Sequence, residues 1–252
     1  MIKIREKRIA FINACEHEFS IADENRAGCN PLDTISLSYD IQQAKQETDY
    51  VLVIIHGGHE HYKLPSPRMK KLYRFFIDQG ADAVLNHHQH CYSGYEVYNS
   101  KPIFYGLGNF CFDSASDIKY RHTTYNYGYL VKLYLASTIK FELIPYEQCY
   151  EKPGVYIMTD QGKNMFKEDI AELNAIIADD QKLTEAFKQI AKEKRKFVYG
   201  VFRPYASRIA KALYYRGLLP SFLNSKRFKI ITATLECESH NDILMTNLKL
   251  EK

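Results

Sequence analysis

Two consecutive strand–helix–strand units restrict the fold of this chain more than any other feature of its sequence. The apolar runs 8–14 and 50–55 predict buried strands, and residues 35–47 between them have the apolar spacing of a helix. A second helix, which begins at a Ser-Pro pair typical of a helix start, is predicted over residues 66–80 and leads into a strand at 81–85. Strands connected through helices lie parallel in one sheet. The sequence therefore predicts an α/β fold.

The pattern changes along the rest of the 252 residues. Residues 95–105 and 127–145 predict two hairpins, which add antiparallel strands to the sheet. From about residue 160 the apolar spacing becomes helical. We therefore expect an α/β domain over residues 1–159, with a mixed sheet flanked by helices, and a basic, mainly helical region over residues 160–252.

The positive charge of the chain is concentrated in its second half. Residues 182–229 contain 13 basic and 2 acidic residues. Within them, residues 203–216 predict a basic amphipathic helix. Such a helix either packs on the α/β domain with its basic face in solvent, or binds anionic polymer or the cytoplasmic membrane surface. Nucleic acid is not expected, because no nucleic-acid-binding fold accompanies the charge.

Several classes of function are excluded by missing motifs. The six cysteines include no C-x-x-C pair, which argues against a zinc ribbon and is typical of reduced thiols. The sequence contains no phosphate-binding P-loop, no G-x-G-x-x-G and no G-x-S-x-G, which argues against nucleotide enzymes and serine hydrolases. No run is long enough to cross a bilayer and no signal peptide is evident, so we expect a cytoplasmic location, with peripheral membrane association through the basic region.

Histidines follow two strands of the predicted parallel sheet, at the point where each strand ends. Six of the nine histidines lie between positions 56 and 90. His56 follows one strand, and His87, His88 and His90 follow the next. The carboxyl ends of parallel strands meet at one edge of the sheet, where α/β proteins build their sites. If residues 88–90 are extended, the side chains of His88 and His90 point the same way. We therefore predict His56, His88 and His90 as ligands of a divalent metal ion such as Mn, Fe or Zn.

Other polar residues lie close to these histidines in the predicted fold. Glu60 is a candidate catalytic base, a partner of a metal ligand, or only a loop carboxylate. Glu16 and Glu18 follow the strand ending at Ala14, and Asn109 follows a glycine-rich turn. Together with His87, these three residues are candidates for supporting the ligands or contacting substrate.

The order of these motifs resembles one family. The segments are Val53-Ile-Ile-His-Gly-Gly-His-Glu60, Asn86-His-His-Gln-His90 and Lys101-Pro-Ile-Phe-Tyr-Gly-Leu-Gly-Asn-Phe110. Together they look like the CapA family of poly-γ-glutamate capsule synthesis proteins, over about residues 9–145. The resemblance implies a fold similar to calcineurin-like metallophosphoesterases, a sandwich of sheets flanked by helices with a two-metal site. It matches His56 to the histidine of an H-x-G segment, and His88 with His90 to an H-x-H pair of metal ligands.

The resemblance also has departures. Family members begin with a Gly-Asp strand end and an Asn-Asn-His segment, and the residues before Ile9 contain neither. We therefore expect the amino-terminal part of the family domain, and some of its ligands, to be missing, leaving an incomplete site and exposed strand edges that favour self-association or a complementary partner. Asn86 stands where the family usually has glycine, in what the sequence predicts to be a tight turn.

Two functional interpretations follow. In the first, the chain is a metal-dependent hydrolase acting on a phosphorylated or acyl substrate in capsule synthesis. In the second, it is a catalytically silent binding or scaffold protein that acts through its basic region on anionic polymer or a membrane.

Overall fold

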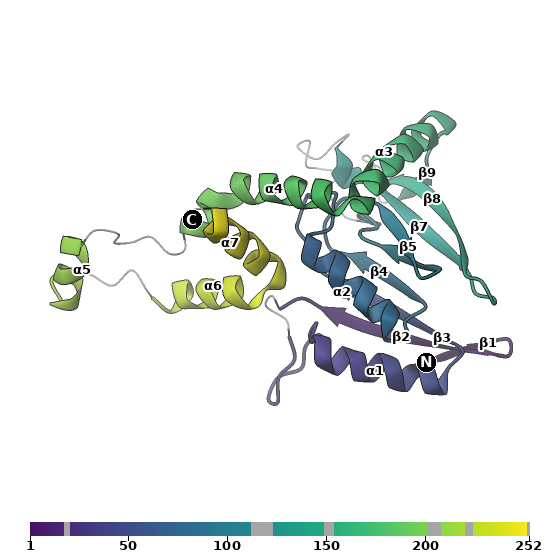
Figure 1. The fold of residues 1–252 in the computed structure, drawn as a ribbon, viewed down its shortest axis with the longest axis horizontal. Coiled ribbons are helices and arrows are strands. Elements are labelled where there is room, and N and C mark those ends of the chain that lie inside the picture. The colour runs from purple at the N-terminus through teal and green to yellow at the C-terminus, as the bar shows by residue number, and fades with distance from the viewer. Residues whose placement is uncertain (18–20, 112–122, 149–153, 201–207, 220–223, 251–252) are drawn as a thin grey trace.

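The larger of two sheets forms the centre of the fold. The structure is a computed structural model, and it describes residues 1–17, 21–111, 123–148, 154–200, 208–219 and 224–250. The sheet has six strands in the order β1-β2-β3-β4-β6-β5 (Figure 1). They are β1 (Ile2–Ile4), β2 (Lys7–Cys15), β3 (Tyr50–His56), β4 (Ala83–His87), β5 (Tyr95–Tyr98) and β6 (Lys101–Phe104). Strands β2, β3, β4 and β6 are parallel, whereas β1 and β5 pair antiparallel at the two edges. The predicted α/β class with a mixed sheet is confirmed.

Two helices cover one face of this sheet. They are α1 (Thr34–Glu47) and α2 (Pro67–Asp78), and each begins where a side chain accepts a hydrogen bond from the first turn. Asp33 caps α1, and Ser66 caps α2 as the Ser-Pro pair predicts. The main core lies between these helices and the sheet. Its fully buried side chains include Ile41, Val51, Val53, Ile55, Met69, Tyr73, Phe76 and Val84.

The second sheet lies against the opposite face of the first. Its antiparallel strands are β7 (Tyr127–Tyr134), β8 (Lys140–Gln148) and β9 (Val155–Ile157), and a short 3-10 helix, η2 (Thr124–Asn126), precedes β7. Leu133 packs on Leu52 and its neighbours there. Phe11 and Leu130 remain about two-fifths exposed, at 40% and 43%. The two-sheet arrangement is consistent with a partial metallophosphoesterase-like sandwich, and self-association of the chain stays a prediction.

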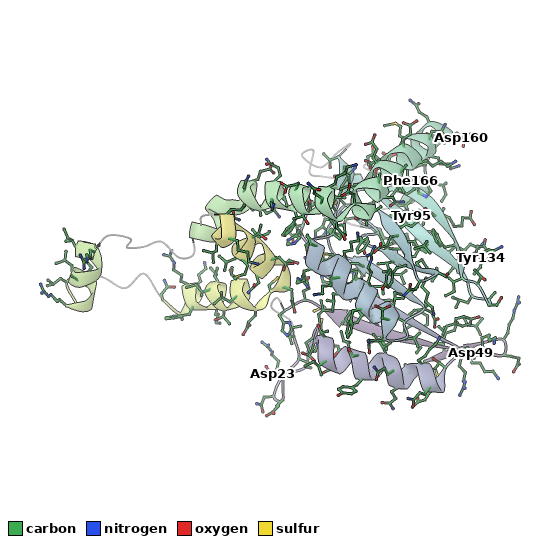
Figure 2. The ribbon with its side chains drawn as sticks, viewed as in Figure 1. Asp23, Asp49, Tyr95, Tyr134, Asp160 and Phe166 are labelled. Carbon is green, nitrogen blue, oxygen red and sulfur yellow. The ribbon has the colours of Figure 1, made fainter. Side chains whose placement is uncertain are left out.

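The helical region begins at α3. The helices are α3 (Asp160–Ala178), α4 (Asp180–Gly200), α5 (Arg208–Tyr215), α6 (Ser225–Glu236) and α7 (Glu238–Leu250). Phe166 of α3 belongs to the main core and lies on the same side of the molecule as Tyr95 of β5 (Figure 2). Thus α3 shares its core with the sheet, and the division of the chain at residues 159 and 160 stays a prediction.

Helices α4 and α7 pack on each other. Their contact is a small apolar cluster of Phe187, Ala191, Ile243 and Leu244. Helix α5 lies apart from this body (Figure 1), and its Ile209 is 75% exposed. The structure therefore does not place α5 on the α/β domain, which was one of the two alternatives for the basic helix.

Two further observations concern the chain as a whole. Among the described residues, no helix combines the length and apolar character that crossing a membrane requires. Cys29, Cys91 and Cys111 are free thiols, whereas Cys149 lies outside the described residues.

Candidate metal centre

The carboxyl ends of three parallel strands lie side by side. Cys15, the last residue of β2, is in register with His56 of β3, and His56 is in register with His87 of β4. Consequently the segments that follow these strands share one edge of the sheet, as the strand–helix–strand pattern predicts.

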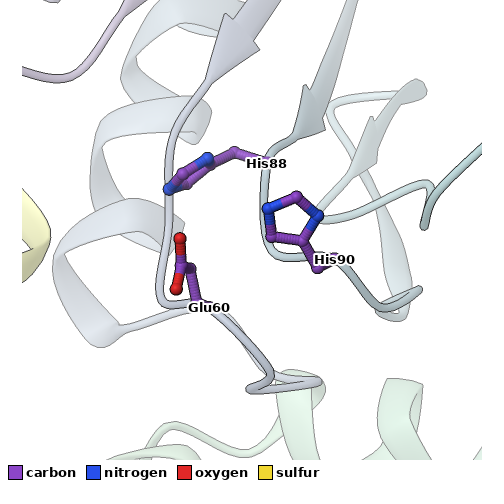
Figure 3. Close-up of side chains that lie close together, drawn as sticks. All are labelled: Glu60, His88 and His90. Atoms are coloured by element: carbon purple, nitrogen blue, oxygen red, sulfur yellow. The ribbon is translucent and has the colours of Figure 1, made fainter. Parts of the chain in front are cut away.

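Three side chains meet at this edge: Glu60, His88 and His90 (Figure 3). One oxygen of the Glu60 carboxylate and one ring nitrogen of each histidine all lie within 4.8 Å of one another. Glu60 is exposed, and the two histidines are half-buried. The group is the one candidate metal site among the described residues. It brings the predicted catalytic residue Glu60 beside two of the predicted ligands.

The backbone that carries the two histidines is a turn and not an extended segment. His88 has φ 110° and His90 has φ 57°, both in the region that favours glycine. Their juxtaposition therefore does not come from strand alternation, and that reason for pairing them was wrong. Non-glycine residues held there cost about 1–3 kcal/mol each and are concentrated at functional sites.

Asn109 holds the ring of His90. Its Oδ1 lies 2.8 Å from Nδ1 of His90, and its Nδ2 donates to the carbonyl oxygen of Tyr125 at 3.0 Å. With the amide oxygen as acceptor, His90 carries its proton on Nδ1, so Nε2 is the ring nitrogen that can bind a metal ion. Asn109 was predicted to support the ligands or to contact substrate, and that role stays a prediction.

The predicted ligand His56 lies next to the cluster. Its ring centroid is 4.4 Å from that of His88, and its Nδ1 lies 3.2 Å from Nδ1 of His87, so that one of these nitrogens donates to the other. Burial and the neighbouring His56 and His88 lower the pKa of His87 to about 4. His87 is therefore neutral at physiological pH.

A cleft of about 470 Å³ opens beside these rings. Its polar lining consists of His56, His87, His88, His90 and Asn109. Its apolar lining comes largely from β7, β8 and the chain before them, with Leu107, Phe110, Leu130, Val131 and Tyr146. A substrate in the cleft would therefore meet both the histidines and an apolar surface.

Glu16 is buried behind the site and does not face the cluster. It is 2% exposed, and its carboxylate accepts from the backbone of Gly58 at 2.9 Å, from Arg68 at 2.7 Å and from the Ser239 hydroxyl. Three donors occupy this carboxylate, which leaves it little capacity to bind a cation. The other candidate acid after this strand, Glu18, lies outside the described residues.

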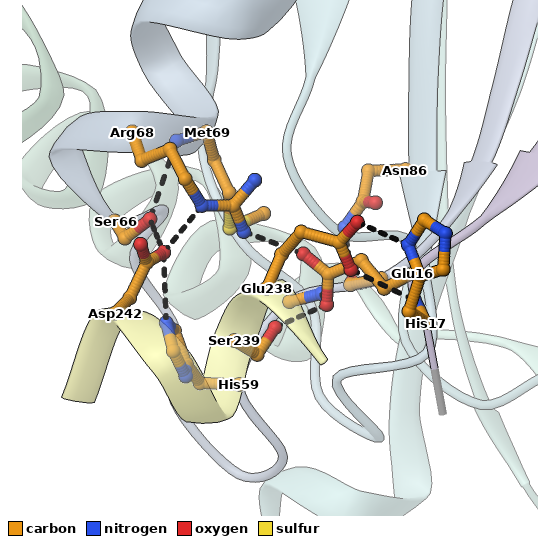
Figure 4. A network of polar contacts seen from close by, with 12 residues as sticks. Glu16, His17, His59, Ser66, Arg68, Met69, Asn86, Glu238, Ser239 and Asp242 are labelled. Carbon is orange, nitrogen blue, oxygen red and sulfur yellow. Dashed lines mark hydrogen bonds and ion pairs between the residues drawn. The ribbon is translucent and has the colours of Figure 1, made fainter. Parts of the chain in front are cut away.

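A network of polar side chains joins α7 to this edge (Figure 4), and sequence reasoning did not predict it. Arg68 bridges Glu16 and Asp242, donating to each at 2.7 Å. His17 pairs with Glu238, with 2.6 Å between Nδ1 and Oε1. Residues of α7 are 221–223 positions away from their partners Glu16 and His17, so no local pattern could have indicated these contacts.

Asn86 is a second residue whose role sequence reasoning missed. It lies inside β4, not in a turn, and is fully buried. Its Oδ1 accepts from the Tyr73 hydroxyl at 2.8 Å, and its Nδ2 donates to the carbonyl oxygens of Gly57 and Tyr105 at 2.8 and 2.9 Å. Asn86 of β4 thus ties together helix α2 and the segments that follow β3 and β6.

The donor set fits a divalent transition metal. A carboxylate oxygen with two imidazole nitrogens suits Mn, Fe and Zn ions. The ligand atoms lie within 4.8 Å of one another, whereas bonds of about 2.0–2.2 Å place two ligands of one ion up to roughly 4 Å apart. Small rotations of these side chains would bring the three atoms to the separation that one ion requires. The fold is therefore that of an α/β protein, with a partly exposed candidate metal centre at the carboxyl edge of its sheet.

The amino-terminal region of the chain is similar to a known family. Residues 1–114 match the family described as bacterial capsule synthesis protein PGA_cap. The match supports the resemblance to the CapA family over this part of the chain.

Two curated relatives share this region. The chain is 41% identical over 94 residues to the PGA biosynthesis protein CapA of Bacillus subtilis (strain 168), which covers 37% of the chain and 25% of that protein. It is 37% identical over 100 residues to the capsule biosynthesis protein CapA of Bacillus anthracis, covering 38% of the chain and 24% of that protein. The matched segment thus spans about a quarter of each relative.

Proposed function

We propose that this protein acts in capsule or poly-γ-glutamate synthesis as a metal-dependent hydrolase. The observation that carries the proposal is the convergence of Glu60, His88 and His90 within 4.8 Å at the open edge of the sheet, beside a cleft. The names of the two Bacillus relatives supply the process.

The residues of the chain have distinct parts in this proposal. Glu60, His88 and His90 would hold the ion, with His56 close enough to join them or to bind a second ion. When bound, a divalent ion polarises a phosphoryl or acyl oxygen. Asn109 orients His90, and the neutral ring of His87 can accept a proton at the wall of the cleft.

Metal binding is tested first. We expect the purified chain to bind Mn²⁺ in calorimetry, and the double substitution His88→Ala, His90→Ala to weaken binding about 100-fold, or by about 2.7 kcal/mol. His240→Gln, which changes a histidine of α7 outside the cluster, is the matched control and should bind as the wild type does. Equal, near-zero metal in wild type and double variant would end the proposal.

Hydrolysis is tested next with the Mn²⁺-loaded protein. Phosphate monoester and diester reporters, together with poly-γ-glutamate followed by its chain length, distinguish a phosphoryl from an acyl substrate. Turnover that is equal in wild type and in the double variant would mean that the cluster is not the catalytic site.

A second candidate function rests on the exposed surface of α5 and α6. Ile209, Phe228 and Ile230 are 75%, 55% and 42% exposed, and the basic residues Arg208 and Lys229 lie beside them. Basic and apolar side chains exposed together favour adhesion to an anionic polymer or to the cytoplasmic membrane surface, where each Lys or Arg contributes on the order of 1 kcal/mol.

Cosedimentation tests this second function. We expect binding to phosphatidylserine vesicles or to poly-γ-glutamate that disappears at high salt and in the Arg208→Glu, Lys229→Glu variant. Lys249→Glu, on exposed α7 surface, is the matched control. Absence of binding at low salt would leave this region without the proposed role.

A further inference from the structure

The loop from His56 to Glu60 is held at two points by helices that lie outside the family match. We propose that α4 and α7 position this loop, with Glu16, Ser239 and Lys194 as positioning residues for Glu60. This inference rests on the metal centre proposed above, because the loop carries one of its three ligands.

The first anchor is Glu16, which lies directly beneath the loop. Its Oε2 accepts from the backbone nitrogen of Gly58 at 2.9 Å, and its own backbone nitrogen donates to the carbonyl oxygen of His56 at 3.0 Å. A Cβ added to Gly57 would lie 2.7 Å from Cγ of Glu16, so the loop backbone rests against this side chain. The position of the Glu16 carboxylate therefore sets the path of the loop.

Helix α7 fixes that carboxylate. The hydroxyl of Ser239 donates to Oε2 of Glu16, and Nη2 of Arg68 donates to Oε1. Arg68 is in turn held by Asp242 of α7, which accepts from its Nε at 2.7 Å (Figure 4). Glu16 and Ser239 are 2% and 3% exposed. Hydrogen bonds buried in this way are stronger than exposed ones, because the protein interior has a low dielectric constant. Two residues of α7 thus hold Glu16, one directly and one through Arg68.

The second anchor is Lys194 of α4. Its Nζ donates to the carbonyl oxygen of Glu60 at 3.3 Å, at the other end of the loop. Helices α4 and α7 form one unit, because Phe187 packs with Ile243 and Leu244, and Asn247 donates to the carbonyl oxygen of Ala191. Lys194 and the residues of α7 that hold Glu16 therefore belong to one pair of packed helices. The loop lies between its contacts with this pair.

The direction in which metal affinity changes distinguishes positioning of the loop by α7 from the alternative, in which α7 withholds ligands from the metal. If α7 positions the loop, cutting its contacts displaces Glu60 and weakens metal binding. If α7 instead withholds Glu16 and His17 from the metal, cutting the same contacts releases two further ligands and tightens binding.

The experiment uses two single substitutions, each with a matched control. We expect Ser239→Ala and Lys194→Met each to raise the dissociation constant for Mn²⁺ about 10-fold, the usual scale for residues that support metal ligands. The visible spectrum of the Co²⁺-loaded protein should change as well, which general destabilisation of a still-folded protein would not cause. Ser225→Ala and Lys192→Met, at exposed positions of α6 and α4, should change neither. Unchanged affinity and spectrum, or tighter binding, would overturn the inference.

A measurement without metal keeps this inference distinct from the proposed function. Hydrogen exchange of the Gly58 amide reports directly on its bond to Glu16. We expect exchange over residues 57–61 to be faster in Ser239→Ala than in the wild type or Ser225→Ala. If the wild type binds no metal, the metal centre fails, and equal exchange rates in all three proteins would show that α7 does not hold the loop either.

Discussion

Two groups of ionisable side chains lie on either side of the same loop, and they differ in burial and in how they are paired. Glu60 is exposed and His88 and His90 are half-buried at the edge of the sheet, with one ligand atom of each within 4.8 Å of the others. Glu16 is buried and Asp242 half-buried behind the loop, and both form ion pairs with Arg68. Acidic residues and histidines near a strand end therefore do not by themselves indicate a site, because burial and neighbouring hydrogen-bond donors decide which of them can bind a ligand.

The largest effect is expected in the buried group. Arg68→Ala would leave the buried carboxylate of Glu16 and the half-buried carboxylate of Asp242 without their shared cation, and breaking a buried pair costs about 3–5 kcal/mol. Urea unfolding should show this loss in the free energy of unfolding. Lys188→Ala removes an exposed ion pair with Glu185 on α4 and should leave that free energy unchanged within error. A loss below about 1 kcal/mol for Arg68→Ala would mean that this network contributes no more than a surface pair.

An intermediate effect, on metal affinity, is expected at Asn109 beside Glu60, His88 and His90. Asn109→Ala frees the ring of His90, so the affinity for Mn²⁺ should fall about 10-fold. Titration calorimetry measures it. Asn174→Ala removes a comparable side-chain bond, to the backbone of Tyr95, far from the histidines, and should lower stability without changing metal affinity. If both variants bind alike, the orientation of His90 does not depend on Asn109.

The smallest effect is a pH dependence of the free energy of unfolding, which comes from His59 in the same loop. Burial, with Lys194 and Arg68 nearby, lowers the pKa of His59 well below its usual value. In the unfolded chain the same ring takes up a proton near pH 6.5, so below that pH the unfolded state binds more protons and stability is lost as the pH falls. The slope from one such group is at most about 1.4 kcal/mol per pH unit.

A substitution isolates this contribution. Free energies of unfolding measured from about pH 7.5 to 5.5 should fall less steeply in His59→Leu than in the wild type. Some slope should remain, because the pKa of His87 is also lowered and its ring acts in the same direction. Identical slopes in the two proteins would show that His59 is not held neutral by its surroundings.

Most of the fold and the location of the site followed from local patterns. The ends of the strands, the Ser66 cap and the histidines at one sheet edge were all predicted, because each depends on residues close in sequence. The turn at residues 88–90 was predicted as extended, since a positive φ at histidine has no sequence signal comparable to glycine. Asn86 was expected in a turn because nothing local shows that its amide meets three partners from separate segments.

The contact between Glu16 and Ser239 has a consequence for the order of assembly. It joins residues 223 positions apart, among the most distant pairs that a chain of this length can form. Contacts of such separation form late, because the intervening chain must first be brought together at an entropic cost. During synthesis the parallel strands leave the ribosome well before α7 and can pair without it. The loop beside the histidines would then reach its final position only after α7 has been made, so the nascent protein has its sheet before its candidate metal centre is complete.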